Sequence, residues 1–443
     1  MSVGTRVSFM MPRRSVALLV ALAFAVVPAS AGADAPDRRI FHIVPGGTGE
    51  GDNWDSAGGL DDLPAFIALA EPADEVWVRG DLGPYETGGS FSIDAGGSAD
   101  APVTVRGVAA DGSRTATPEI VGTRSSPFDP DGEAGAELFR LGKGADHLRF
   151  TNVAVADHGN GVFRIRADIR GLSLTNMRVW NVTRFVEDYA SAGGGTATVT
   201  GLHIEQVEVR GYSKSAIRLR YDSNDVVIRD VLGDAERQDP GSDDFSMGVH
   251  LDDTVHDVWL ERVTMRNNVD PRGDDEYWNG DGFAAEGATY GITLRDTLAA
   301  GNSDAGYDLK SDGVMLIRAR ARGNMRNYRF WGRATAFGCR SAAPTRHGGT
   351  GGTADVWVGE DARVRLVACE LSDDTSTRPT FDIGDRAALT HLYVGADRRV
   401  RIDAEDTATV RQVPIAEVAC PPGAVATPRD GINSTFYREI ATC

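Results

Sequence analysis

Residues of the kinds that bind metals and carboxylates are concentrated between residues 243 and 310. Hard cations such as Ca2+ prefer several oxygen ligands, and clustered carboxylates supply them. Arg218, Arg220, Lys310 and Arg329 are basic residues in or beside this region, and a mixture of acids and bases suits a carboxylate ligand next to a metal. The alternative is that the acids only solvate the turns of an acidic protein. The acids are Asp243, Asp244, Asp252, Asp253, Asp274, Asp275, Glu276, Asp281, Glu286, Asp304 and Asp308.

These residues lie within a repeated pattern, which indicates the elements that position them. Seven segments each begin with alternating apolar residues, pass a polar pair and continue into a second apolar alternation: 147–157, 171–181, 201–211, 225–234, 257–267, 291–302 and 314–324. Aligned on their central apolar residues, they are 24, 30, 24, 32, 34 and 23 residues apart. A repeat near 23 residues with insertions and period-2 patterning predicts an all-β solenoid, a right-handed parallel β-helix.

A second set of short strands is expected at 161–168, 215–222, 247–253, 281–287, 305–311 and 326–332. Because side chains alternate between the two faces of a strand, every second residue points outward. Stacked coils lie about 4.8 Å apart, so the outward residues should form two columns in direct contact. One column is Arg164, Arg218, His250, Ala284, Asp308 and Arg329, and the other is Arg166, Arg220, Asp252, Glu286, Lys310 and Trp331. The extra residues at 187–195, 235–246 and 269–279 are expected to form loops beside these columns.

The two ends of the solenoid carry their own signals. Residues 55–72 predict a capping helix, with strands at 75–79 and 103–106, so the capped β-helix is expected over 37–338. Residues 339–443 predict less regular final coils. All four cysteines lie there, and three pairings are possible. We favour Cys339–Cys369 and Cys420–Cys443, which would staple this end, and no pair has the spacing of a zinc site.

The N-terminus predicts export. Arg13 and Arg14 precede an apolar run from Val16 to Val27, and Ala29-Ser30-Ala31 offers a cleavage site, so residues 1–31 indicate a signal peptide. No other long apolar stretch exists, which predicts a secreted or periplasmic protein with no membrane partner. The net charge is −18. This balance argues against nucleic acid, which needs a basic stripe, and we expect a monomer.

Two segments resemble a known family. Residues 279–285 (NGDGFAA) and 302–309 (NSDAGYDL) resemble the paired coil motifs of family 9 pectate lyases, and the likeness is best over 245–315. Those enzymes are right-handed parallel β-helices that hold Ca2+ through aspartates and use a lysine as the base for β-elimination on a polyuronate. The chain departs from the pattern at Glu286, where the family usually has lysine, and at Ala305, where it usually has aspartate.

The resemblance implies a site for an acidic polysaccharide. Asp281 matches the motif aspartate, Asp252 or Asp253 an upstream calcium ligand, and Asp275 and Glu276 the remaining acidic pair; with Glu286 they form the expected metal set. Lys310 would be the base, provided that neighbouring cations depress its pKa. Arg218 or Arg329 would grip the uronate carboxylate, and His250 or water would protonate the leaving oxygen.

Other roles stay open at this point. Arg220 and Asp308 are expected to contact the substrate. Trp331 would either stack on a sugar ring or pack beneath a C-terminal loop. Two alternatives to a lyase remain: a β-helix glycoside hydrolase that uses Asp281, Asp304 and Asp308, and a non-catalytic glycan-binding solenoid.

Overall fold

The computed structural model describes residues 38–189, 195–241, 244–372, 379–396 and 400–412. The expected signal peptide and the expected Cys420–Cys443 bond lie outside these residues. From Arg39 onward the chain forms one compact unit. Within the described residues, no helix is both long and apolar enough to cross a lipid bilayer.

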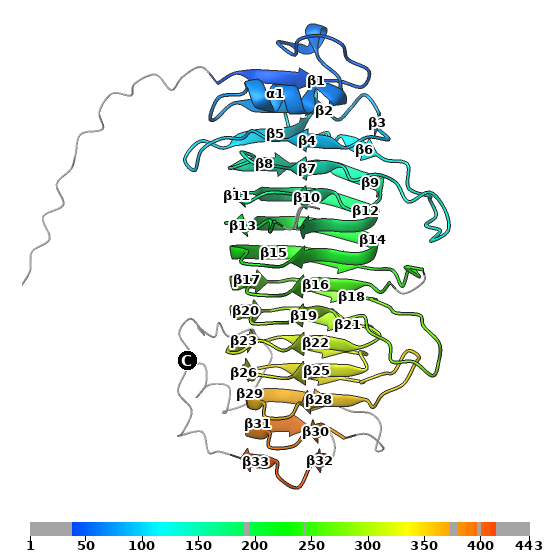
Figure 1. Ribbon diagram of the computed structural model, residues 1–443, viewed down its shortest axis with the longest axis vertical. Helices are drawn as coiled ribbons and strands as arrows, with labels where there is room; N and C mark the ends of the chain where they lie inside the picture. The colour runs from blue at the N-terminus through cyan, green and yellow to red at the C-terminus, as the bar shows by residue number, and fades with distance from the viewer. Residues whose placement is uncertain (1–37, 190–194, 242–243, 373–378, 397–399, 413–443) are drawn as a thin grey trace, which may run out of the picture. The chain divides into compact units, whose positions relative to one another are not determined.

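Parallel strands wind into coils that follow one another in sequence order, and their pairings define three faces (Figure 1). The first face contains β4 (Phe91–Ile93), β7 (Phe139–Leu141), β10 (Phe163–Ile165), β16 (Met247–Leu251), β19 (Phe283–Ala285), β22 (Ala305–Leu309), β25 (Arg326–Phe330), β28 (Ala354–Val358), β30 (Phe381–Ile383) and β32 (Ile402–Ala404). The second contains β1 (Ile40–Ile43), β2 (Glu75–Arg79), β5 (Val103–Val108), β8 (Leu148–Thr151), β17 (His256–Glu261), β20 (Tyr290–Arg295), β23 (Val314–Ile317), β26 (Arg333–Phe337) and β33 (Thr409–Gln412). The third contains β3 (Tyr85–Glu86), β6 (Glu119–Val121), β9 (Ala154–His158), β18 (Thr264–Arg266), β21 (Leu298–Ala300), β24 (Arg320–Arg322) and β27 (Arg340–Ala342). The predicted right-handed parallel β-helix is confirmed.

Seven further strands join these faces. β12 (Ser173–Asp188) and β14 (His203–Leu219) each run through the second, third and first faces. β15 (Asn224–Asp234), β29 (Arg363–Ser372) and β31 (Ala388–Ala396) run through the second and third. The short strands β11 (Ile169–Arg170) and β13 (Val199–Thr200) pair with each other.

The polar pair of the repeat is explained by the bend between the second and third faces. One residue at this bend has a positive φ, for example Asn152 (56°), Asn176 (49°), Asp230 (53°) and Asp296 (53°). Asn and Asp tolerate this left-handed conformation better than other non-glycine residues. The bend therefore selects a polar residue between two apolar runs, and this selection made the repeat visible in the sequence.

The interior is held by two stacks of side chains. On the first face, Phe283, Tyr307 and Tyr328 point inward as predicted, and their rings stack with centroids 5.0 and 5.1 Å apart. At the turn from the third face to the first, the buried Asn302 accepts from the Asn268 amide and donates to the Asn324 carbonyl, at 2.8 Å each. These amides satisfy backbone groups that would otherwise be buried without a partner.

The ends agree with the sequence in outline. The capping helix α1 (Leu63–Leu69) is shorter than the predicted 55–72 because Pro64 sits in its first turn. Two single-turn 3-10 segments, η1 (Trp54–Ser56) and η2 (Leu60–Asp62), precede it. The predicted strands at 75–79 and 103–106 are confirmed as β2 and β5. The favoured Cys339–Cys369 disulfide is confirmed, and coil pairing continues past it to β33.

One part of the predicted register was incomplete. The loop expected at 187–195 begins later, because β12 continues through Glu187 and Asp188 and forms a first-face strand. Glu187 therefore lies in the outward column between Arg164 and Arg218, which the sequence had placed side by side. The strand escaped notice because the chain passes from face to face here without a glycine or proline turn.

Candidate functional site

The predicted columns are assembled on the outside of the first face, over β14, β16, β19, β22 and β25. Arg218, His250, Ala284, Asp308 and Arg329 are direct partners in successive strands. The second column follows two residues later. Its register is fixed by backbone hydrogen bonds from Asp252 N to Leu219 O, Glu286 N to Leu251 O, Lys310 N to Ala285 O and Trp331 N to Leu309 O, all between 2.7 and 3.0 Å.

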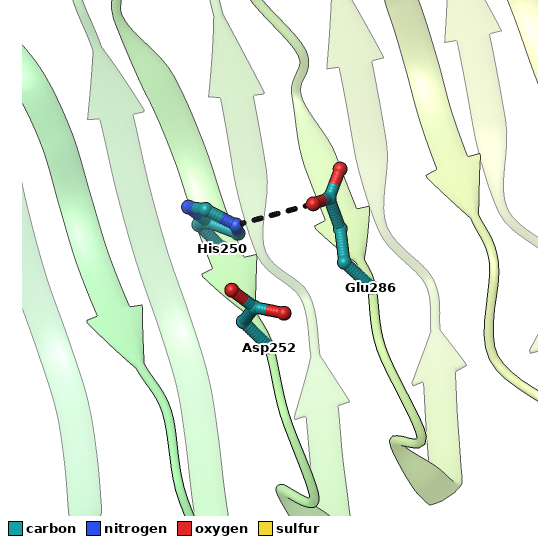
Figure 2. Close-up of side chains that lie close together, drawn as sticks. All are labelled: His250, Asp252 and Glu286. Carbon is teal, nitrogen blue, oxygen red and sulfur yellow. Dashed lines mark ion pairs between the residues drawn. The ribbon is translucent and has the colours of Figure 1, made fainter.

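Glu286 is at the centre of the exposed part of this surface. Lys310 Nζ donates to Glu286 Oε1 at 2.5 Å, and His250 Nε2 lies 4.0 Å from Glu286 Oε2. Figure 2 shows His250, Asp252 and Glu286 converging from two adjacent coils. Their ligand atoms all lie within 4.8 Å of one another. We call His250, Asp252, Glu286 and Lys310 the Glu286 cluster.

Lys310 is held in its charged form. Burial lowers the pKa of its ammonium group, but the nearby carboxylates of Asp308, Glu286 and Asp281 outweigh that effect and raise the pKa above its ordinary value. The condition under which Lys310 was expected to act as a base, a pKa depressed by neighbouring cations, is therefore not met. A charged ammonium group at this place can neutralise an anion or donate a proton.

His250 is held in its neutral form. Burial and the neighbouring Arg218 lower its pKa to about 4, against weaker opposing effects of Glu286 and Asp252. Its buried Nε2 has no hydrogen-bond partner among the described residues. A neutral imidazole with a free ring nitrogen can accept a proton or bind a cation, which differs from the proton-donating role expected from the sequence.

Three acids lie beneath the surface rather than on it. Asp281, Asp304 and Asp308 are 3%, 1% and 2% exposed. Asp281 accepts from the Ala305 amide at 2.8 Å. Burial and the nearby charges of Asp304 and Asp308 raise the pKa of Asp281 well above its ordinary value. The surroundings of Asp281 therefore favour its neutral form more than those of a free aspartate do.

The buried acids support the side chains above them. Arg329 donates to Asp304 at 3.0 Å, and Trp331 Nε1 donates to Asp308 at 2.6 Å. Asp304 also accepts from the Tyr277 hydroxyl at 2.6 Å. Trp331 stays 37% exposed and meets Trp357 edge to face, with ring centroids 4.5 Å apart. The buried Asp308 thus holds Trp331 in place, and Trp331 packs edge to face against Trp357.

The remaining acids of the expected metal set do not join the cluster. Asp253 accepts from the Tyr221 amide at 3.2 Å. Asp275 and Glu276 are exposed in the segment between β18 and β19, and Asp281 is buried against Ala305. That leaves two carboxylates and one imidazole, with one Glu286 oxygen bound to Lys310. Ca2+ takes six to eight oxygen ligands, so the described residues do not form the oxygen-rich set that the resemblance implied.

Sequence reasoning missed several residues beside the cluster. Tyr277 connects the 269–279 segment to the buried acids through Asp304 and accepts from Arg326 at 2.8 Å. Glu137, Arg184, Glu187 and Tyr189 line a cavity with Arg164, Arg166, Arg218 and Arg220. Only Glu187 carried a signal, the apolar pair Phe185 and Val186 directly before it.

Comparisons with known proteins gave only distant likenesses. No protein-family model matches the chain, and no curated protein matches it. Among solved structures, the Agl-KA catalytic domain is similar with a TM-score of 0.49 and 9% identity, over 79% of this chain and 64% of that one. The chain thus spans less than two thirds of that domain's length.

Two further solved structures are similar. Pectate lyase Pel9A has a TM-score of 0.34 and 13% identity over 83% of this chain and 79% of that one. Alginate lyase from Paenibacillus sp. str. FPU-7 has a TM-score of 0.39 and 11% identity over 78% of this chain and 96% of that one. With every TM-score below 0.5, these likenesses carry no argument about activity, which has to be argued from the site itself.

Proposed function

We propose that the protein is an exported lyase that cleaves a uronate-containing, acidic polysaccharide by β-elimination. The observation that carries the proposal is the Glu286 cluster. It places a charged lysine and a neutral histidine on either side of one carboxylate, on an outward face that also carries Arg218, Arg220 and Arg329. In a chain of net charge −18, this local supply of cations suits a polyanion.

The protonation states favour the following division of labour. Lys310 and a neighbouring arginine neutralise the uronate carboxylate, which makes the proton on C5 more acidic. His250, neutral at working pH, accepts that proton. The C5–H electron pair forms the C4–C5 double bond, the C4–O bond breaks, and the leaving oxygen takes a proton from water or from the Lys310 ammonium group. His250 thus takes the role of base that was first expected for Lys310, and Lys310 takes the role of proton donor that was first expected for His250.

Calcium binding stays a prediction. His250, Asp252 and Glu286 are the described residues best placed to bind a divalent ion, yet Lys310 competes for Glu286. No step above depends on the ion. Activity that survives exhaustive treatment with a chelator would remove calcium from the proposal and leave the residue roles as stated.

The decisive experiment is incubation with a panel of polyuronates, with Ca2+ or with chelator, followed by ultraviolet absorbance of new double bonds. Lys310→Ala should reduce turnover by about a hundredfold or more, because one preorganised contact to the developing charge contributes that much, while the arginines of the same face keep the polymer bound. Lys143→Ala, at an exposed lysine after β7, is the matched control and should behave as wild type. Equal turnover in the two variants would contradict the role of Lys310, and polymer binding by wild type without any new double bonds would favour a non-catalytic binding protein.

A hydrolase remains a second candidate because of the buried acids. A protonated carboxyl beside ionised ones is the arrangement that glycoside hydrolases use for general acid catalysis. The raised pKa of Asp281 favours its neutral form, as a general acid needs. Against it, all three acids are almost completely covered. New reducing ends without new double bonds would select the hydrolase.

A further inference from the structure

A basic cavity lies on the first face, one coil before His250. It has a volume of about 290 Å3, and five arginines from three consecutive coils line it: Arg164, Arg166, Arg184, Arg218 and Arg220. The sequence had placed four of them in the outward columns and had missed Arg184. We call this cavity the arginine pocket.

The acids that line the arginine pocket do not balance its positive charge. Glu187 contacts Arg164 directly and lies 3.2, 3.6 and 3.4 Å from nitrogens of Arg184, Arg218 and Arg220. Glu137 lies 3.4 Å from Arg166 and 3.9 Å from Arg164. Two carboxylates are therefore shared among five guanidinium groups.

Asp188 beneath the pocket does not supply the missing charge. Its carboxylate lies 3.9 Å from Arg220 Nε and accepts the Arg220 backbone amide. Burial raises the pKa of Asp188 to about 7, so it is only partly ionised at neutral pH. Net positive charge remains in the pocket even when Asp188 is counted.

This charge is also poorly solvated. The Arg164 and Arg184 side chains are 3% and 10% exposed. The buried Nε atoms of these two residues, and those of Arg218 and Arg220, have no hydrogen-bond partner among the described residues. Buried guanidinium groups whose N–H donors are only partly satisfied are costly unless an anion joins them. The pocket is therefore short of oxygen acceptors as well as of negative charge.

The arginines are held in place before any ligand arrives. The guanidinium carbons of Arg164 and Arg166 lie 4.4 and 5.3 Å from the centre of the Tyr189 ring. The Asn160 side chain donates to Glu137 at 2.7 Å and fixes the carboxylate between these two arginines. Because planar guanidinium groups bind carboxylate and sulfate oxygens in pairs, a preset group of them recognises an oxyanion specifically.

We infer that the arginine pocket is a subsite for one acidic group of the polysaccharide, a carboxylate or a sulfate ester, upstream of the Glu286 cluster. This inference rests on the proposed function and adds the direction of the substrate. Arg218 and Arg220 border the pocket, and Arg218 is the direct strand partner of His250. Successive coils lie about 4.8 Å apart. A polymer that reaches both the pocket and Lys310 must therefore run across the coils rather than along one strand.

The test uses Arg166→Gln in the full-length protein. The Arg166 side chain is 33% exposed and, among the described residues, forms an ion pair with Glu137 alone. Replacing it should therefore leave the fold intact. Long uronate oligosaccharides should bind about tenfold more weakly by calorimetry, the order expected for one charge-assisted contact. KM for long substrates should rise with kcat unchanged, because this contact is equally strong in ground and transition states. The shortest cleavable oligosaccharide should be unaffected.

Arg178→Gln is the matched control, since Arg178 is exposed on the third-face part of β12, the strand that also carries Glu187. Two probes, glucuronate and inorganic sulfate, tell the two acidic groups apart: the one that competes with the oligosaccharide in wild type, and less in Arg166→Gln, is the ligand of the pocket. Unchanged binding of long oligosaccharides by Arg166→Gln would overturn the inference even if cleavage is observed. Weakened binding without any cleavage would support the pocket and contradict the lyase.

Discussion

At the scale of single residues, charge state decides what the Glu286 cluster can do. Lys310 and His250 flank the same carboxylate, yet the pKa of Lys310 is raised and the pKa of His250 is lowered to about 4. The lysine stays charged because acids surround it, whereas the histidine stays neutral because it is buried beside an arginine. Roles assigned from residue type alone would have been reversed, because the deciding neighbours come from other coils.

Arg218→Gln should raise the pKa of His250. Arg218 is, after burial, the largest cause of the low value of about 4. Without that charge the pKa should rise but stay below 6.5, since the burial persists. The measurement is a titration of the histidine ring protons by NMR, with the signal assigned by its loss in His250→Gln. The acid limb of kcat/KM should move upward with it. An unchanged titration would show that Arg218 does not act on His250.

His158→Gln should make the protein less sensitive to acid. His158 is fully buried on β9, and burial lowers its pKa to about 4. Between pH 6.5 and 4 the unfolded histidine binds a proton and the folded one does not, so stability falls as pH falls through this window. The loss attributable to this residue is roughly 3 kcal/mol, at 1.36 kcal/mol per pKa unit. Urea unfolding at pH 7 and pH 4 should show a smaller difference for the variant than for wild type.

The sequence predicted least about the burial and the contacts of single side chains. Alternation correctly indicated that Arg218, His250, Asp308 and Arg329 share a column, because strand periodicity fixes which side of a strand a residue faces. Asp281 lies two residues before the inward-facing Phe283, so alternation was compatible with its burial, but the resemblance assigned it to a metal site. Other acids of the calcium set carried over from the resemblance lie between strands, where periodicity gives no information.

At the scale of elements, the asparagine ladder at the turn into the first face joins three coils. Asn302→Ala should lower the free energy of unfolding by about 3 kcal/mol, because it leaves the buried backbone amide and side-chain amide of Asn268 without their acceptor. Denaturant unfolding measures the change. Asn224→Ala, at a side chain bonded only to the nearby Asp222 carbonyl, is the control and should cost much less. Equal losses would show that the ladder adds no stability.

Most strands were predictable from their apolar alternation, and the exception is the first-face part of β12. The bend between the second and third faces needs a left-handed residue, so it left a polar mark in each repeat. β12 leaves the third face at the left-handed Asn181, but its first-face part was overlooked because the buried Asp188 takes the inward position that the apolar Ile165 holds in the coil before. The arginine pocket was missed for the same reason, because Glu187, its central acid, lies on that coil.

At the scale of the whole molecule, removal of the expected signal peptide would change the net charge of the protein. The segment 1–31 holds three arginines and no acid, so its removal would make the net charge more negative than −18. We expect the exported protein to begin at Gly32, or a few residues later, and to be monomeric. N-terminal sequencing and sedimentation of the secreted protein check both expectations. A secreted form that retains Arg13 and Arg14 would contradict the assignment of a signal peptide.

Among the described residues, each strand pairs only with strands of the coils before and after it, and a few loop contacts such as that of Arg237 with His347 reach further. When the two ends of such a solenoid are pulled apart, the interfaces between successive coils should therefore separate one at a time. Pulled by its termini, the molecule should therefore peel in a series of small releases, each freeing one winding. The Cys339–Cys369 bond should withhold the residues between the two sulfurs from that extension until it is reduced.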